Sequence, residues 1–284
     1  MKTPQNQRSN IPALLALILI AGLAIIAAHP ALAAGPTSTG LTVAPAELNI
    51  TKAMATMDAA FDEGNWPRAA AYGELITLNA ENDENGDTVP AAVWCKWGYS
   101  LRKMGKYDKA LAAASVGVEK DQDNAEVYLN RGYTYLALGE YRNARIDAEE
   151  ALRLAPDSAS STASATAYNI IALGLLGEGD PKNALIAAET ALVLRPDHVH
   201  YLNTKGVALM QLEKYSDAVA ILTQATESQD QYIAPYPDAI PPEENLKTAQ
   251  RLYDENKAPD VLIYIAAAAI LAIGAGAIFL QKRK

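Results

Sequence analysis

Side chains that commonly perform catalysis or bind metal ions are scarce in this 284-residue chain, which has three histidines and one cysteine. His198 and His200 flank one residue at the expected start of a helix, directly after Asp197. Two imidazoles at this spacing seldom converge on one ion, so we expect a solvated turn there. Cys95 has no histidine or second cysteine near it in the sequence to make its thiol reactive. These residues predict a protein that is not an enzyme and holds neither a metal ion nor another cofactor.

An acidic stretch from Glu81 to Asp87 resembles the first half of a calcium-binding loop, because oxygen-bearing side chains alternate before Gly86. The position that should carry a bidentate glutamate is Ala92. We therefore expect a solvated acidic loop, with calcium binding as the alternative. The chain also lacks the glycine-rich pattern that binds nucleotide phosphates.

Composition limits the partners and the core. The formal charge is −9, which argues against a nucleic-acid partner, because neutralising phosphates requires an excess of lysine and arginine. Half of the residues are apolar but only 7% are aromatic. The core must therefore be filled mainly by aliphatic side chains, above all alanine.

The first 33 residues have the order of a secretory signal. Lys2 and Arg8 precede the apolar stretch Ile11 to Ala28, and an Ala-Leu-Ala sequence ends at Ala33. Residues 1–33 are predicted to be a signal peptide cleaved after Ala33 or an uncleaved signal anchor. Both alternatives export the chain that follows, where Asn49 begins a possible glycosylation sequon.

A second apolar stretch, Val261 to Leu280, contains 20 residues without charge and precedes the basic tail 281–284. This length can cross the hydrocarbon core of a bilayer, and flanking basic residues stay in the cytoplasm. We expect a transmembrane helix with a cytoplasmic C-terminus and an extracytoplasmic body. The rival interpretation is a cell-envelope structural protein whose C-terminal segment is a processed sorting or lipid-attachment signal.

A repeat with a spacing of 34 residues lies between these two ends. Trp94 and Gly98 align with Tyr128 and Gly132, and the alanines that follow align as well. Within residues 125–158 the landmarks are Tyr128, Gly132, Tyr135, Gly139, Tyr141, Ala144, Ala148, Ala151 and Pro156. This pattern resembles the tetratricopeptide repeat.

Five copies fit the same frame: 50–83, 91–124, 125–158, 165–198 and 199–232. The resemblance implies an all-α, right-handed superhelical solenoid of helix-turn-helix repeats, to which the single C-terminal transmembrane helix is added. Small residues at Gly98, Gly132, Ala172 and Gly206 would let paired helices approach closely.

The segments that flank the repeats are expected to have three different structures. Residues 34–49 are expected to be a linker. Residues 233–242, rich in proline, are expected to be an extended stalk, and residues 243–257 are expected to be a capping or juxtamembrane helix.

The resemblance also implies that the first helices of successive repeats line a concave groove that holds an extended peptide or a partner helix. By frame position the predicted groove residues are Tyr99, Arg102, Leu129, Tyr133, Asn169, Leu173, Asn203 and Val207.

A basic cluster lies in the second repeat, at Arg102, Lys103, Lys106 and Lys109. We interpret it as a solvated turn, with binding of an acidic partner or an envelope polymer as the alternative. The expected function is a membrane-anchored, extracytoplasmic scaffold for protein–protein interaction.

Overall fold

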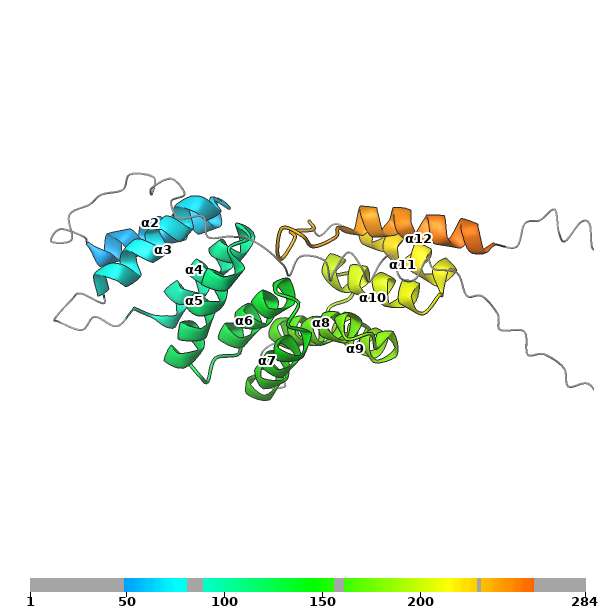
Figure 1. Ribbon diagram of the computed structural model, residues 1–284, viewed down its shortest axis with the longest axis horizontal. Helices are drawn as coiled ribbons and strands as arrows, with labels where there is room; N and C mark the ends of the chain where they lie inside the picture. Colours follow the sequence, from blue (N-terminus) through cyan, green and yellow to red (C-terminus); the bar gives the residue numbers. More distant parts are fainter. Residues whose placement is uncertain (1–48, 81–88, 156–160, 229–230, 258–284) are drawn as a thin grey trace, which may run out of the picture. The chain divides into compact units, whose positions relative to one another are not determined.

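The structure is a computed structural model that describes residues 49–80, 89–155, 161–228 and 231–257. All regular secondary structure in these ranges is α-helical, as predicted (Figure 1). The helices are α2 (Ile50–Asp62), α3 (Trp66–Ala80), α4 (Ala91–Lys103), α5 (Tyr107–Lys120), α6 (Ala125–Ala137), α7 (Tyr141–Leu154), α8 (Ser161–Gly177), α9 (Pro181–Leu194), α10 (Val199–Gln211), α11 (Tyr215–Glu227) and α12 (Pro242–Asn256).

The two helices of each pair are joined by short turns with left-handed backbone. After α4, Gly105 has φ +71°, and the amide of Lys106 donates to the carbonyl of Leu101 at 2.9 Å. This is the hydrogen bond of a Schellman motif, which satisfies a carbonyl at the helix end and favours glycine because glycine has no Cβ. Gly139 has φ +75° at the equivalent turn after α6. Recurring glycines therefore fix where four of the first helices end, and Glu213, with φ +60°, takes this place after α10.

Alanine fills the space between paired helices. Ala110, Ala144, Ala184 and Ala218 occupy equivalent positions in the second helices, and all four are 0% exposed. Opposite them the first helices carry the small residues that the repeat predicts. The chain thus builds its core from close helix approach rather than from large side chains, as its composition predicts.

Four first helices begin where the repeat frame begins, at Ile50, Ala91, Ala125 and Val199. Helix α8 differs, because it begins at Ser161, four residues before its frame. The residues between the third and fourth copies therefore partly extend a helix.

Residues 233–242 are not the stalk that their prolines predict. The chain from 231 to 241, which we name the return segment, turns back onto α4, α5 and α10, to which its carbonyl and carboxylate oxygens are hydrogen-bonded. Proline excludes helix but does not determine where an extended chain runs, and here side-chain donors of α4, α5 and α10 hold it. Helix α12 then packs against α11 and α10, with Ala249 buried beside Leu222, and so caps the last repeat.

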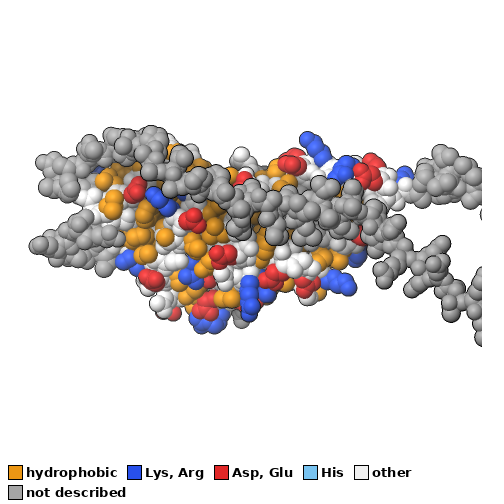
Figure 2. Space-filling view, in the orientation of Figure 1, with side chains coloured by type: hydrophobic (Ala, Val, Ile, Leu, Met, Phe, Trp, Pro, Cys, Tyr) orange, Lys and Arg blue, Asp and Glu red, His pale blue; other side chains and the backbone are white. Residues whose placement is uncertain are grey.

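The outer surface of α7 mixes acidic and basic side chains (Figure 2). Arg153 pairs with Glu150 at 2.5 Å, and Arg145 with Glu178 at 3.1 Å. This mixture is typical of a solvated face.

Within the described ranges, no helix is both long enough and apolar enough to span a membrane. The predicted segments 1–33 and Val261–Leu280 lie outside these ranges, and so do the linker 34–48 and the acidic stretch Glu81–Asp87.

Candidate functional site

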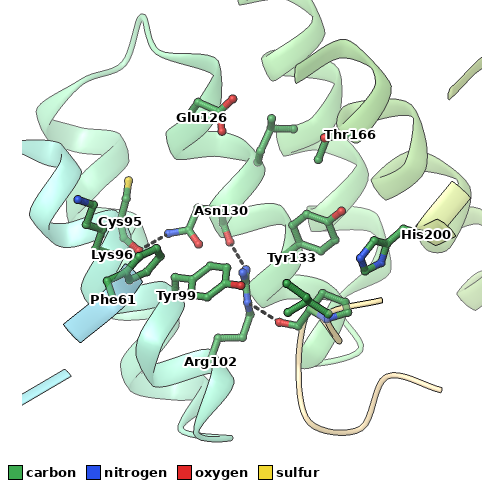
Figure 3. A pocket seen from close by; sticks show the side chains of 13 residues that line it. Phe61, Cys95, Lys96, Tyr99, Arg102, Glu126, Asn130, Tyr133, Thr166 and His200 are labelled. Atoms are coloured by element: carbon green, nitrogen blue, oxygen red, sulfur yellow. Dashed lines mark hydrogen bonds between the residues drawn. The ribbon is translucent and has the colours of Figure 1, made fainter. Parts of the chain in front are cut away.

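A cavity of about 440 Å³ lies between the first helices of the repeats and the return segment (Figure 3). Its walls come from α2, α4, α6, α8 and α10, which contribute aromatic, amide and charged side chains. The lining residues are Phe61, Cys95, Lys96, Tyr99, Arg102, Glu126, Leu129, Asn130, Tyr133, Thr166, His200, Ile233 and Pro235. The return segment itself therefore forms part of the wall.

Arg102 is the central polar residue of the site and is only 1% exposed. Its guanidinium donates to the carbonyls of Asn130 at 2.8 Å and Pro235 at 3.1 Å (Figure 3). It also lies over the rings of Tyr99 and Tyr133, 5.0 and 5.3 Å from their centroids. Burial lowers the pKa of Arg102 to about 10, so the group stays charged near neutral pH. Among the described residues no carboxylate pairs with it, and carbonyl oxygens and ring faces balance the charge instead.

Aromatic rings form one side of the cavity. Phe61, Trp66 and Tyr99 pack with ring centroids 5.1 to 5.5 Å apart. Lys103 lies over the Trp66 ring at 5.5 Å. These rings join α2, α3 and α4 and give this wall rigid apolar faces.

Tyr133 forms the opposite side of the cavity, in front of buried polar side chains of α8 and α10. Burial raises its pKa well above the usual range, so its hydroxyl stays protonated. The Asn169 side chain acts on the pKa of this hydroxyl in the opposite direction, by less than burial raises it. Asn169 is 1% exposed and accepts a hydrogen bond of 2.8 Å from Thr204, which joins α8 to α10 beside Tyr133.

The return segment is bound mainly through its backbone oxygens. Besides the Arg102 bond to Pro235, Lys103 donates to the carbonyl of Ala234, and the Asn203 amide donates to the carbonyl of Ile240 at 3.0 Å. Asn245 in α12 donates to Asn203 at 2.9 Å and orients it. Side-chain donors that read backbone carbonyls are suited to an extended chain, whose carbonyls are not used by a helix.

Tyr236 supplies the main side-chain contact of the return segment. It packs against the apolar cluster that contains Leu129, Tyr133 and Ile170. A turn follows at once, in which the amide of Ala239 donates to the carbonyl of Tyr236 at 3.1 Å and Pro237 takes the second position, where proline is favoured. The turn brings Asp238 to the hydroxyl of Tyr107 at 2.8 Å.

The predicted groove residues divide into four classes by position. Tyr99, Arg102, Leu129 and Tyr133 line the cavity, and Asn203 binds the return segment. Asn169 is buried behind Tyr133. Leu173 and Val207 instead pack against apolar core clusters.

Other residues of the site were not singled out from the sequence. Lys103 belongs to the basic cluster interpreted as a solvated turn, yet it binds the carbonyl of Ala234. Asn130 donates to the carbonyl of Cys95 at 3.0 Å and lines the cavity. Tyr236 belongs to the segment that was expected to be a stalk, and Tyr107 was not among the predicted groove residues. The basic cluster was the one sequence signal that pointed toward this contact.

The residues considered for chemistry take other parts. His198 stacks on Tyr201 with centroids 4.1 Å apart, and His200 lies against Tyr232 at 4.7 Å. Asp197 accepts a hydrogen bond from Gln224 at 2.5 Å. The described ranges contain no group of three metal-ligating side chains. Asn49 caps α2, because its side-chain oxygen accepts the Lys52 amide at 2.8 Å.

A sequence profile described as "Tetratricopeptide repeat" matches residues 95–159 and 171–233. This match supports the tetratricopeptide repeat as the unit of the chain. The matched residues span most of α4 to α11 and include every cavity-lining residue except Phe61, Thr166 and Pro235. No curated protein sequence matches the chain.

Solved structures agree on the fold. A tetratricopeptide repeat protein from Parabacteroides merdae ATCC 43184 is similar at TM-score 0.52 with 16% identity, over 73% of this chain and 74% of that one. A fragment of MamA (41-end) from Desulfovibrio magneticus RS-1 is similar at TM-score 0.50 with 18% identity, over 64% of this chain and 97% of that one. At such identities the similarity establishes the helical-repeat fold alone.

Proposed function

We propose that this protein is a membrane-anchored tetratricopeptide-repeat scaffold that binds an extended segment of a protein partner in its groove and catalyses no reaction. The observation that carries the proposal is the Arg102 site. A buried cation stacked between Tyr99 and Tyr133 donates to a backbone carbonyl that lies in an extended chain. Such a site binds peptide backbone whatever the sequence, and the neighbouring apolar walls supply selectivity.

The proposal places the groove outside the cytoplasm. The support is the order of the sequence: a signal-like segment at 1–33, the repeats, and an uncharged stretch followed by a basic tail. The proposed anchor is Val261–Leu280.

Site-specific photocrosslinking tests the binding proposal. A photoactivatable amino acid is placed at Leu129, which lines the cavity, in the full-length chain expressed in intact cells. We expect crosslinks to defined partners, and we expect Tyr99→Ala together with Tyr133→Ala to abolish them. The matched control is Tyr128→Ala, because this half-buried tyrosine lies on α6 with Tyr133 but does not line the cavity. Circular dichroism verifies that each variant is folded, and crosslinks that persist unchanged in the double variant contradict the proposal.

Thiol labelling tests the location independently. In a Cys95→Ser background, Asp108→Cys places one thiol at an exposed position of α5. A membrane-impermeant maleimide should label this thiol in intact cells, whereas Lys284→Cys in the basic tail should react only after lysis. The reverse pattern contradicts the proposed topology.

A further inference from the structure

The connection between α11 and α12 is longer than their packing requires. The two helices pack against each other, yet 14 residues, from 228 to 241, join them. The turns within the repeats need only three, as from Met104 to Lys106 between α4 and α5. Connections between adjacent helices usually take two to eight residues, and longer ones are commonly functional. The extra length carries the chain to the second repeat, where Arg102, Lys103 and Tyr107 bind it.

The return segment is bound to the groove by a few surface contacts, as a peptide ligand would be, and is not buried like an element of the core. Ile233 and Ile240 are 52% and 53% exposed, and Pro237 and Asp238 are exposed as well. Its hold consists of hydrogen bonds to a few oxygens and the packing of Tyr236. Apart from Tyr236 little apolar area is therefore lost when it leaves, and we expect the repeats to stay folded without it.

The groove, by contrast, depends on an occupant. When the segment leaves, Arg102 loses the carbonyl of Pro235, although its guanidinium remains surrounded by Tyr99, Tyr133 and α6. A buried donor without an acceptor is costly, so another carbonyl is favoured in the same place. Water fills the position less well, because the ring faces on either side are apolar.

We propose that the return segment is an intramolecular ligand that closes the groove, and that the partner is an extended protein segment of the same chemistry which replaces it. This inference rests on the proposed function and specifies its partner class. The segment itself defines that class: two successive carbonyls for Lys103 and Arg102, then an aromatic side chain followed by proline, then an acidic residue for Tyr107. The basic residues Lys106 and Lys109 beside Tyr107 favour the acidic position.

The test uses the full-length chain in detergent and a fluorescent peptide of residues Gln231 to Pro241. The opened variant combines Pro235→Gly, Tyr236→Ala and Asp238→Ala in the chain, which removes the docked contacts but keeps the length. We expect the peptide to bind this variant at least about tenfold more tightly than the wild type, because a docked segment lowers the fraction of open groove. A peptide carrying Tyr236→Ala and Asp238→Ala should not bind.

Two further variants locate the binding. Lys103→Met and Tyr107→Phe, each added to the opened variant, should weaken peptide binding several-fold. Tyr215→Phe should leave it unchanged, because Tyr215 has the same place in its repeat but its hydroxyl has no bond to the return segment in the described structure. Equal peptide binding by the wild type and the opened variant, or binding by neither, overturns the inference.

The two proposals fail in different ways. Crosslinks that require Tyr99 and Tyr133 but are equally strong in the wild type and the opened variant leave the scaffold standing and refute the intramolecular ligand. Crosslinks that are unchanged by Tyr99→Ala together with Tyr133→Ala refute the scaffold proposal, regardless of the result of the peptide-binding experiment.

Discussion

The hydroxyl of Tyr107 donates a hydrogen bond of 2.8 Å to Oδ2 of Asp238, which joins the first residue of α5 to a carboxylate 131 residues later. Burial, together with this carboxylate, raises the pKa of Tyr107 to about 12, so the hydroxyl remains a donor at every physiological pH. The bond lies at the turn that ends the contact of the return segment with the second repeat. It is therefore the contact most easily removed without disturbing the core.

Tyr107→Phe should loosen the return segment without unfolding the repeats. An exposed hydrogen bond contributes about 1 kcal/mol, so we expect faster amide exchange at Ala239, whose amide closes the turn, and a small change in the unfolding midpoint. Hydrogen–deuterium exchange of the full-length chain measures the first effect, and thermal unfolding measures the second. Tyr215→Phe is the control and should leave exchange at Ala239 unchanged. Unaltered exchange in Tyr107→Phe would show that the bond does not hold the turn.

Arg131 and Asp147 form a buried pair that joins α6 to α7. Two nitrogens of the guanidinium donate to the two carboxylate oxygens at 2.7 and 2.8 Å, and the Asp147 side chain is only 4% exposed. Burial raises the pKa of Asp147, and the hydrogen bonds and charge of Arg131 oppose this rise. We expect Arg131→Met to lower the free energy of unfolding by about 3–5 kcal/mol, because it leaves this carboxylate unpaired.

Denaturant unfolding of the full-length chain measures this loss, and an exposed pair gives the control. Arg153 and Glu150 lie 2.5 Å apart in α7, but the arginine side chain is 64% exposed. Arg153→Met should therefore cost less than about 1 kcal/mol. The double variant Arg131→Met with Asp147→Leu should recover much of the stability, because no buried charge then remains. Equal losses in Arg131→Met and Arg153→Met would refute the distinction.

The helical pairs could be predicted from the sequence because their causes are local. Gly105 and Gly139 end first helices, alanines recur on the second, and the spacing of 34 residues aligns them. Four of the five first helices begin where the frame places them. The start of α8 could not be fixed, because serine, threonine and alanine between the third and fourth copies contain no strong helix breaker.

The cavity could be predicted in part. The frame identified Tyr99, Arg102, Leu129 and Tyr133, since the repeat brings equivalent helix faces together. It missed the return segment because the periodic pattern ends near Tyr232. The contacts of this segment also join residues more than 130 positions apart, and no local pattern reports such a pairing. The sequence around Lys103 is typical of a solvated turn. Its hydrogen bond to the carbonyl of Ala234 forms only because the return segment folds back onto α4.

Gly206 and Gly132 occupy the same position in their repeats but tolerate a side chain differently. A Cβ on Gly206 would meet Cγ of Leu222 at 2.4 Å, and Leu222 is fully buried. On Gly132 the nearest atoms would lie at 3.5 Å, an ordinary contact distance. We expect Gly206→Ala to destabilise the protein by about 1–3 kcal/mol. Gly132→Ala should be neutral or slightly stabilising, because alanine favours helix. Thermal unfolding of the two variants checks this, and equal midpoints would contradict it.

Cys95, the sole cysteine, should react slowly with alkylating reagents in the folded protein. Burial raises the pKa of its thiol to about 11, so at pH 8 about one molecule in a thousand carries the thiolate, against about a quarter for a free cysteine. We expect carbamidomethylation by iodoacetamide, followed by intact mass, to be roughly 200-fold slower than in urea. The rate should rise tenfold per pH unit up to pH 10, because the folded thiol loses its proton only near pH 11. The urea-unfolded chain should instead reach a plateau above pH 9, and a similar plateau in the folded chain would show that burial does not shield the thiol.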